Sequence, residues 1–256
     1  MTNFIAMLRQ RLDRGDTLLC AWMSGNDPAN AEILVREGFD TALFDLQHGT
    51  CDFIGATLGI AAVALAGKPA LARIPVGEFQ TASRLLDAGA AAIVAPMINS
   101  AAEALAFAQF VKYPPLGARS WGPARAVMLS GLTPDAFFAE ANHTQLAIAM
   151  IETRAALADL EQILATPGID GVLVGPADLS LALSNGVELA PDGEAVIAAM
   201  THIAARAHAH GKLAAAFGLH AANAKLLRSL GYNLVSISTD AGLLRLGARA
   251  ELEQLR

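Results

Sequence analysis

Apolar runs of strand length recur eight times along the chain, and each is followed by a segment of helix length. Near-continuous apolar runs are typical of strands buried on both faces of a parallel sheet. Hairpin signals are missing between the runs, which favours eight β-then-α units closed into a barrel over an open sheet. The predicted strands are Leu18–Met23, Thr41–Gln47, Ala70–Pro75, Ala92–Met97, Leu146–Glu152, Gly171–Gly175, Leu213–Phe217 and Asn233–Thr239.

The segments between these runs carry helix boundary signals. Asp27-Pro28 and Thr133-Pro134 are typical of an N-cap followed by proline in the first turn. Glycines expected at helix ends precede several strands, at Gly38, Gly89, Gly211 and Gly231. One connection, residues 113–131, is long. A loop of that length in a compact domain is usually functional or lies at an interface.

Composition supports this architecture. The chain has 256 residues, of which 54% are hydrophobic, and this length is usual for one such barrel. We therefore predict a single (β/α)8 TIM barrel domain over residues 1–256. The net charge is −6 and the sequence contains no run of Lys or Arg, which argues against a nucleic-acid partner. The two cysteines, Cys20 and Cys51, are predicted to be reduced thiols.

Membrane and secretion signals are weak in this sequence. The mean hydropathy is +0.42, but the longest apolar stretch, residues 54–66, is too short to span a bilayer. The short apolar segment at the N-terminus is followed at once by Arg9, Arg11 and Arg14, which is unlike a secretory signal. We expect a cytoplasmic protein without a membrane partner.

Ionisable residues gather at the predicted strand ends, where the active site of a (β/α)8 barrel forms. Five of the eight ends carry one, although only 16% of residues are charged. Helix capping is an alternative for single residues such as Asp45, Glu152 and Asp240, but it does not account for the whole set. The set comprises Asp45 and His48 after the second strand, Arg73, Glu152, Asp178 and Asp240.

Two common chemistries are disfavoured by where the lysines and histidines fall. Schiff-base catalysis needs a lysine near the strand tops, but Lys68 and Lys212 precede strands while Lys112 and Lys225 fall in helices. Zinc bound by histidines is also disfavoured. The remaining histidines, His143, His202, His208, His210 and His220, are predicted on helix surfaces or at a helix start.

Two carboxylates on adjacent strands remain, Glu152 and Asp178. Oxygen ligands with room for water and substrate suit Mg²⁺ or Mn²⁺. The Gly175-Pro176 turn before Asp178 leaves backbone amides, near Ala177, that are free to bind a substrate carboxylate. The residues alone therefore favour a metal-dependent reaction on a carboxylate substrate.

The chain resembles the HpcH/HpaI aldolases, the class II pyruvate aldolases that include 4-hydroxy-2-oxoheptanedioate aldolase. The resemblance runs from about Ala21 to about Leu244. GPADLS after an IET strand, with DxxHG and RxP upstream, is its most specific part. The matching segments are AEILVREGFD, FDLQHG, ARIP, LLDAGAAAIVAPMINS, YPPLGARS, IETRAAL and GPADLS.

The resemblance implies reversible aldol cleavage of 4-hydroxy-2-oxo acids to pyruvate, or hydroxypyruvate, and an aldehyde. Glu152 and Asp178 would ligate a divalent cation, Mg²⁺, Mn²⁺ or Co²⁺, that acts as a Lewis acid. Arg73 would stabilise the enolate. His48, oriented by Asp45, would serve as the base.

The resemblance also implies a substrate pocket and an assembly. The pocket would use Trp22, Gln47, Phe217 and the turn residues Gly175, Pro176 and Ala177. Asp87 would serve a neighbouring subunit's histidine, and the loop with Arg119 would reach into a neighbouring site. The expected assembly is a homo-oligomer, a hexamer built from trimers.

Two departures from the family pattern concern the pocket. Gln47 stands where glutamate is commoner, which removes a negative charge near the metal. Phe217 stands where an aliphatic residue is common, which should narrow the pocket around the aldehyde. The alternatives are a citrate-lyase-β-like or malyl-CoA-lyase-like enzyme acting on CoA thioesters, a phosphoenolpyruvate-handling enzyme, and a non-catalytic 2-oxo-acid sensor. A chain ending soon after the eighth helix argues against the CoA-thioester reading.

Overall fold

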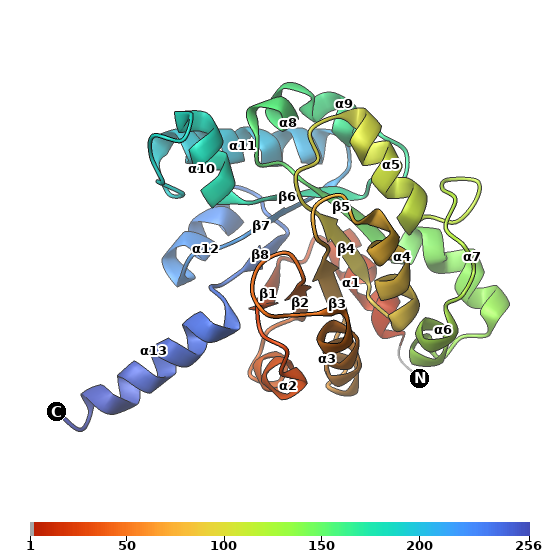
Figure 1. Ribbon diagram of the computed structural model, residues 1–256, viewed down its shortest axis with the longest axis horizontal. Helices are drawn as coiled ribbons and strands as arrows, with labels where there is room; N and C mark the ends of the chain where they lie inside the picture. The colour runs from red at the N-terminus through yellow and green to blue at the C-terminus, as the bar shows by residue number, and fades with distance from the viewer. Residues whose placement is uncertain (1–2) are drawn as a thin grey trace.

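The computed structural model describes residues 3–256 and contains a closed barrel of eight parallel strands in sequence order (Figure 1). β1 pairs with both β2 and β8, which closes the cylinder. All eight predicted strands are confirmed, and the (β/α)8 fold with them. The strands are β1 (Leu18–Met23), β2 (Thr41–Asp45), β3 (Ala70–Arg73), β4 (Ala92–Ala95), β5 (Leu146–Met150), β6 (Gly171–Val174), β7 (Leu213–Ala216) and β8 (Leu234–Ser236).

Helices surround the barrel on the outside (Figure 1). They are α1 (Phe4–Asp13), α2 (Pro28–Arg36), α3 (Phe53–Leu65), α4 (Phe79–Ala88), α5 (Ala101–Val111), α6 (Ala124–Ser130), α7 (Pro134–Thr144), α8 (Arg154–Ala158), α9 (Leu160–Ala165), α10 (Pro176–Ser184), α11 (Glu194–Ala209), α12 (Ala221–Ser229) and α13 (Asp240–Glu253).

Alternating strand residues face two different apolar clusters, as a period of two requires. On β1, Cys20 and Trp22 belong to the cluster inside the barrel. Ala21 and Met23 belong to the cluster between the strands and the helices. Both faces of each strand are therefore buried, which explains the near-continuous apolar runs.

The helix caps follow the predicted signals in part. Asp27 caps α2 and Thr133 caps α7, each with proline in the first turn. Gly89 ends α4 with φ of 112°, in the left-handed region open to glycine. Glu152 is not a helix cap, because the hydroxyl of the following residue, Thr153, caps α8. Asp240 is not a cap either, because the hydroxyl of the preceding residue, Thr239, caps α13.

The long connection at residues 113–131 differs from the prediction, because its second half is the helix α6. The helix ends at Gly131, which has φ of 70°. In the first half, Tyr113 and Trp121 contact each other, and both contact Phe138 of α7. Trp121 and Phe138 are each about half exposed, so this connection presents apolar surface.

Two further features concern the ends of the chain. α1 buries Ile5 and Leu8 in the interior cluster, so it closes the N-terminal end of the barrel. α13 extends away from the barrel (Figure 1), and among its residues none is buried. Across residues 3–256, the structure contains no helix with the length and apolar character needed to cross a membrane.

Candidate active site

A cavity of about 260 Å³ opens at the C-terminal ends of the strands. This is the end at which (β/α)8 barrels build their active sites. Nine of the residues expected from the sequence to form the pocket or its chemistry line this cavity. Others that the sequence did not single out as site residues, such as Ser24, Met150 and Thr239, join them. The full lining is Trp22, Ser24, Asp45, His48, Gly49, Arg73, Met150, Gly175, Pro176, Ala177, Asp178, Phe217 and Thr239.

The guanidinium of Arg73 is held by a two-pronged ion pair with Asp45. Arg73 Nε donates to Asp45 Oδ1 at 2.8 Å, and Nη2 donates to Oδ2 at 2.5 Å. Both side chains are buried. The remaining nitrogen, Nη1, lies 3.9 Å from Met150 Sδ. The pair therefore fixes the plane of the guanidinium and leaves Nη1 for the pocket.

Trp22 completes this arrangement. Its indole Nε1 donates to Asp45 Oδ2 at 3.1 Å, and the Arg73 guanidinium carbon lies 4.9 Å from the centroid of its ring. Phe217 meets the same ring edge-on, with centroids 5.0 Å apart. One buried carboxylate thus sets the positions of a cation and an aromatic wall.

The predicted link between Asp45 and the His48 imidazole is not formed. Asp45 Oδ1 instead accepts from the backbone nitrogens of Gln47 and His48, at 3.1 and 3.3 Å. The reason is that both carboxylate oxygens are already committed to Arg73. Asp45 shapes the turn that presents His48, and the exposed imidazole projects at the pocket rim.

Glu152 lies buried beneath the pocket, and the backbone of the turn that follows β4 holds its carboxylate. Its Oε1 accepts from Met97 N at 2.8 Å. Burial raises the pKa of Glu152 to about 7, the Met97 hydrogen bond opposes this rise, and the negative charge of Asp178 adds to it. Its Oε2 is buried and accepts no hydrogen bond within residues 3–256.

Met97 reaches this position through an unusual backbone conformation, which the sequence did not reveal. Its φ is 56°, in the left-handed region that side chains other than glycine rarely adopt. Asn99 Nδ2 donates to Met97 O at 2.9 Å, and Thr153 donates its hydroxyl to Asn99 Oδ1. These contacts over-determine the turn, as strained backbone at a functional site requires.

Asp178 projects from the first turn of α10, whose N-terminus faces the pocket. Glycine at position 175 leaves room for Glu152, because a Cβ atom here would lie 2.6 Å from Glu152 Oε2 and would displace that carboxylate. The turn therefore lets Glu152 approach the backbone before Asp178. Early helix N–H groups also lack intrahelical partners, so they are available to an anion.

Gln47 lies outside the pocket lining. Its Oε1 is a second buried oxygen without a hydrogen bond in the described chain. Over residues 3–256 the structure contains no cluster of three or more His, Cys, Asp or Glu side chains arranged to hold a metal. A cation between Glu152 and Asp178 would thus have only two protein carboxylates and would need oxygens from elsewhere.

Arg119 is not among the residues that line the pocket of its own chain. Its side chain is fully buried in its own chain, where Nη1 donates to Gln145 Oε1 at 2.7 Å and Nη2 donates to Asp87 Oδ1 at 2.5 Å. The guanidinium also stacks over Tyr113. Asp87 itself is 27% exposed. Within its own chain Arg119 therefore has a structural role, and its expected role at a neighbouring subunit's site stays a prediction.

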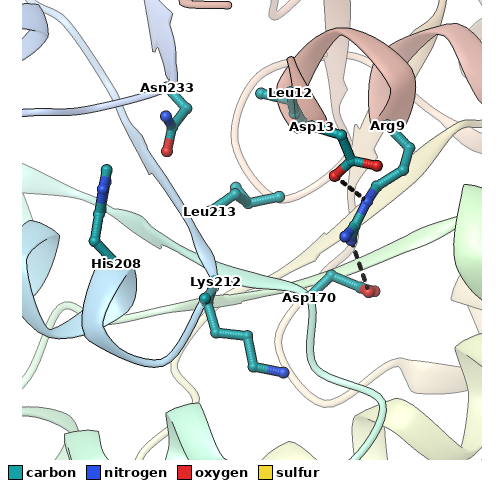
Figure 2. Close-up of a pocket in the computed structure, with 9 residues that line it drawn as sticks. Arg9, Leu12, Asp13, Asp170, His208, Lys212, Leu213 and Asn233 are labelled. Carbon is teal, nitrogen blue, oxygen red and sulfur yellow. Dashed lines mark ion pairs between the residues drawn. The ribbon is translucent and has the colours of Figure 1, made fainter. Parts of the chain in front are cut away.

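A second cavity, of about 210 Å³, lies at the opposite end of the barrel (Figure 2). Arg9 from α1 lies between Asp13 and Asp170, 2.7 and 3.7 Å from their oxygens. Buried Lys112 also pairs with Asp170, at 2.7 Å. These ion pairs tie α1 and α5 to the start of β6. They also confirm that Lys112 lies far from the catalytic face.

The barrel and the polar groups at its C-terminal mouth define a (β/α)8-barrel enzyme with a buried carboxylate, an oriented arginine and an exposed histidine. Comparison with known proteins specifies it further. The sequence pattern described as "HpcH/HpaI aldolase/citrate lyase" matches residues 18–246. The chain belongs to that family, and it is a carbon–carbon lyase of the aldolase type.

Individual relatives agree with this assignment. A hydroxypyruvate/pyruvate aldolase from Rhizorhabdus wittichii is 35% identical over 244 residues, which cover 95% of this chain and 96% of the relative. A 5-keto-4-deoxy-D-glucarate aldolase from Salmonella arizonae is 29% identical over 246 residues, covering 96% and 93%. The crystal structure of a family member from Burkholderia cenocepacia superposes with a TM-score of 0.87 at 29% identity, covering 98% and 99%.

Proposed function

We propose that this protein catalyses the reversible, divalent-metal-dependent aldol addition of pyruvate or hydroxypyruvate to an aldehyde. The observation that carries the proposal is the free buried Oε2 of Glu152, which faces the turn before Asp178 below a pocket that holds Arg73 and His48. A buried carboxylate oxygen is costly without a partner. The names of the relatives support the choice of 2-oxo acid.

Glu152 and Asp178 fit a Mg²⁺ or Mn²⁺ ion, because both offer hard oxygen ligands and one of these is an unpartnered buried oxygen. When bound, such an ion supplies Lewis acidity to the C2 carbonyl of the 2-oxo acid and so makes its C3 protons easier to remove.

The chain's own groups then have distinct tasks. The first-turn amides of α10 bind the substrate carboxylate. Arg73, fixed by Asp45, directs Nη1 towards the developing enolate oxygen and stabilises its charge. Because Asp45 has already oriented the guanidinium, little reorganisation is needed when the charge forms.

His48 moves the protons at the pocket rim. In the cleavage direction it accepts the proton from the C4 hydroxyl. The C3–C4 bond then breaks, the electron pair of that bond forms the enolate, and the aldehyde leaves. C3 of the enolate then takes up a proton to give pyruvate. In the addition direction C3 attacks the aldehyde carbon, and the aldehyde oxygen receives a proton. No oxidant or reductant is consumed.

Product formation tests the proposal. Purified protein with pyruvate, an aldehyde and Mg²⁺ should produce a 4-hydroxy-2-oxo acid, and EDTA should abolish the product. Asp178→Ala should abolish turnover while circular dichroism shows an intact fold. An Asp178→Ala variant that retains full activity would contradict the assigned metal position.

A homo-oligomer is part of the proposal, and α13 supports it. Leu244 and Leu246 are 72% and 60% exposed, and Leu252 is 53% exposed, although isolated helices of this length are marginally stable in water. A second copy of the chain would cover these leucines. Light scattering should show a multimer for the wild type, whereas Leu244→Glu with Leu252→Glu should reduce its mass. A wild-type monomer would contradict this part.

A further inference from the structure

The two halves of the catalytic cavity differ in chemistry. The strands β2 and β3 and the helix α10 contribute all of its ionisable lining residues, counted over residues 3–256. The half formed by β7, β8 and β1 contributes none. The ionisable set is Asp45, His48, Arg73 and Asp178, and the opposite half consists of Phe217, Thr239, Trp22 and Ser24.

The uncharged half has an apolar wall. Trp22 and Phe217 meet edge to face at 5.0 Å, and Trp22 cannot turn away because its Nε1 is hydrogen-bonded to Asp45. Phe217 is partly exposed and lines the cavity. A ligand group on this side therefore meets ring carbons, with one hydroxyl each from Ser24 and Thr239.

No free cation serves this half among the described lining residues. Arg73 is the only guanidinium in the lining, and its charge is paired with Asp45. An acidic group lies directly behind Ser24, because Asp240 accepts hydrogen bonds from Ser24 N, at 3.0 Å, and Ser24 Oγ, at 2.6 Å. A substrate carboxylate placed here would lose water without gaining a cationic partner and would face the like charge of Asp240.

The 2-oxo acid occupies the charged half under the proposed function, so the aldehyde occupies the other. We infer that the acceptor is an uncharged aldehyde with an apolar chain, and that aldehydes bearing a second carboxylate are rejected. Trp22 and Phe217 act as specificity-determining residues. This inference rests on the proposed function, and it deepens that function by naming the acceptor class.

The test compares two acceptors with the same carbon skeleton up to the carboxyl group, 4-oxobutanoate, which is charged, and its methyl ester, which is not. With pyruvate and Mg²⁺, kcat/KM for the ester should exceed that for the carboxylate at least tenfold. The wild-type ratio decides the matter without any variant. A preference for 4-oxobutanoate, equal use of the two, or no turnover of the ester would overturn the inference.

Variants locate the cause of the preference. Phe217→Arg places a cation in the apolar wall and should lower the ester-to-carboxylate ratio at least tenfold, provided that circular dichroism shows a folded protein. Leu65→Arg adds the same charge at an 80% exposed position on α3 and should leave the ratio unchanged. Equal changes in both variants would mean that overall charge, and not the wall, sets the preference.

Failure of the proposed function is seen separately. Metal-dependent exchange of the pyruvate methyl protons with solvent requires no acceptor. Loss of that exchange refutes the aldolase proposal itself. Exchange combined with preference for the carboxylate acceptor refutes the acceptor class alone.

Discussion

Replacing Glu152 with glutamine should stabilise the metal-free protein at neutral and alkaline pH. The pKa of Glu152 rises from its usual 4.5 to about 7 because the side chain is buried. Each pKa unit corresponds to about 1.36 kcal/mol. Ionising Glu152 in the folded protein therefore costs about 3 kcal/mol, which Glu152→Gln removes while its amide oxygen can still accept from Met97 N.

The sign of the pH dependence follows from the raised pKa. Below pH 4.5 the carboxyl is protonated in both the folded and the unfolded chain, so the penalty is absent. Between pH 4.5 and about 7 the folded protein retains a proton that the unfolded chain releases, and stability falls as pH rises. Above pH 7 the penalty is complete, and the advantage of the variant is largest.

Urea unfolding in EDTA at pH 5 and pH 8 measures this difference. The variant should gain stability over the wild type at pH 8 by up to about 3 kcal/mol, and by much less at pH 5. Glu140→Gln, at an exposed position on α7, controls for the loss of one negative charge. A Glu152→Gln advantage that is equal at both pH values, or absent at both, would refute the reasoning. Added Mg²⁺ should stabilise only the wild type.

Three other substitutions test the supporting structure. Lys112→Met leaves Asp170 without its buried partner and should cost about 3–5 kcal/mol in urea unfolding; a loss below about 1 kcal/mol would show that the pair contributes little. Asp45→Asn removes the charge that orients the guanidinium and should slow pyruvate proton exchange by about a hundredfold, with Mn²⁺ affinity nearly unchanged. Asn99→Ala should weaken Mn²⁺ binding about tenfold by releasing the turn at Met97, and unchanged affinity would mean that the turn holds without it.

The fold was predictable because the barrel imposes a simple pattern. Both faces of each strand are buried, so the apolar runs mark the strands directly. The strand ends were less exact. The run at residues 41–47 was predicted to be strand throughout, whereas β2 ends at Asp45 because this side chain accepts from Gln47 N and turns the chain. The pattern of apolar residues along the chain does not reveal that hydrogen bond.

The site was predictable as a set of residues, but their contacts were not. Position at a strand end placed Glu152, Asp178, Arg73 and His48 at one mouth. The partner of each carboxylate depends on how far side chains reach across the strands. The sequence predicted that Asp45 contacts the His48 imidazole, whereas in the structure it pairs with Arg73. The role of Met97 could not be read from the sequence, because it donates only its backbone N–H.

Arg119 shows the same limit from the opposite direction. The sequence resemblance placed it in a loop that reaches into a neighbouring subunit's site. In the structure its Nη1 and Nη2 donate to Gln145 and Asp87 inside one chain, and its guanidinium stacks over the Tyr113 ring. A sequence motif identifies the residue but does not establish which partners surround it.

Proton exchange at pyruvate tests the central claim most directly. Protein incubated with pyruvate in deuterated water, with Mn²⁺ or Mg²⁺ added after EDTA treatment, should lose the methyl proton signal in proton NMR only when metal is present. Glu152→Gln and Asp178→Ala should abolish the exchange. Folded wild-type protein that exchanges no methyl protons with any divalent metal would contradict the proposed enolate chemistry.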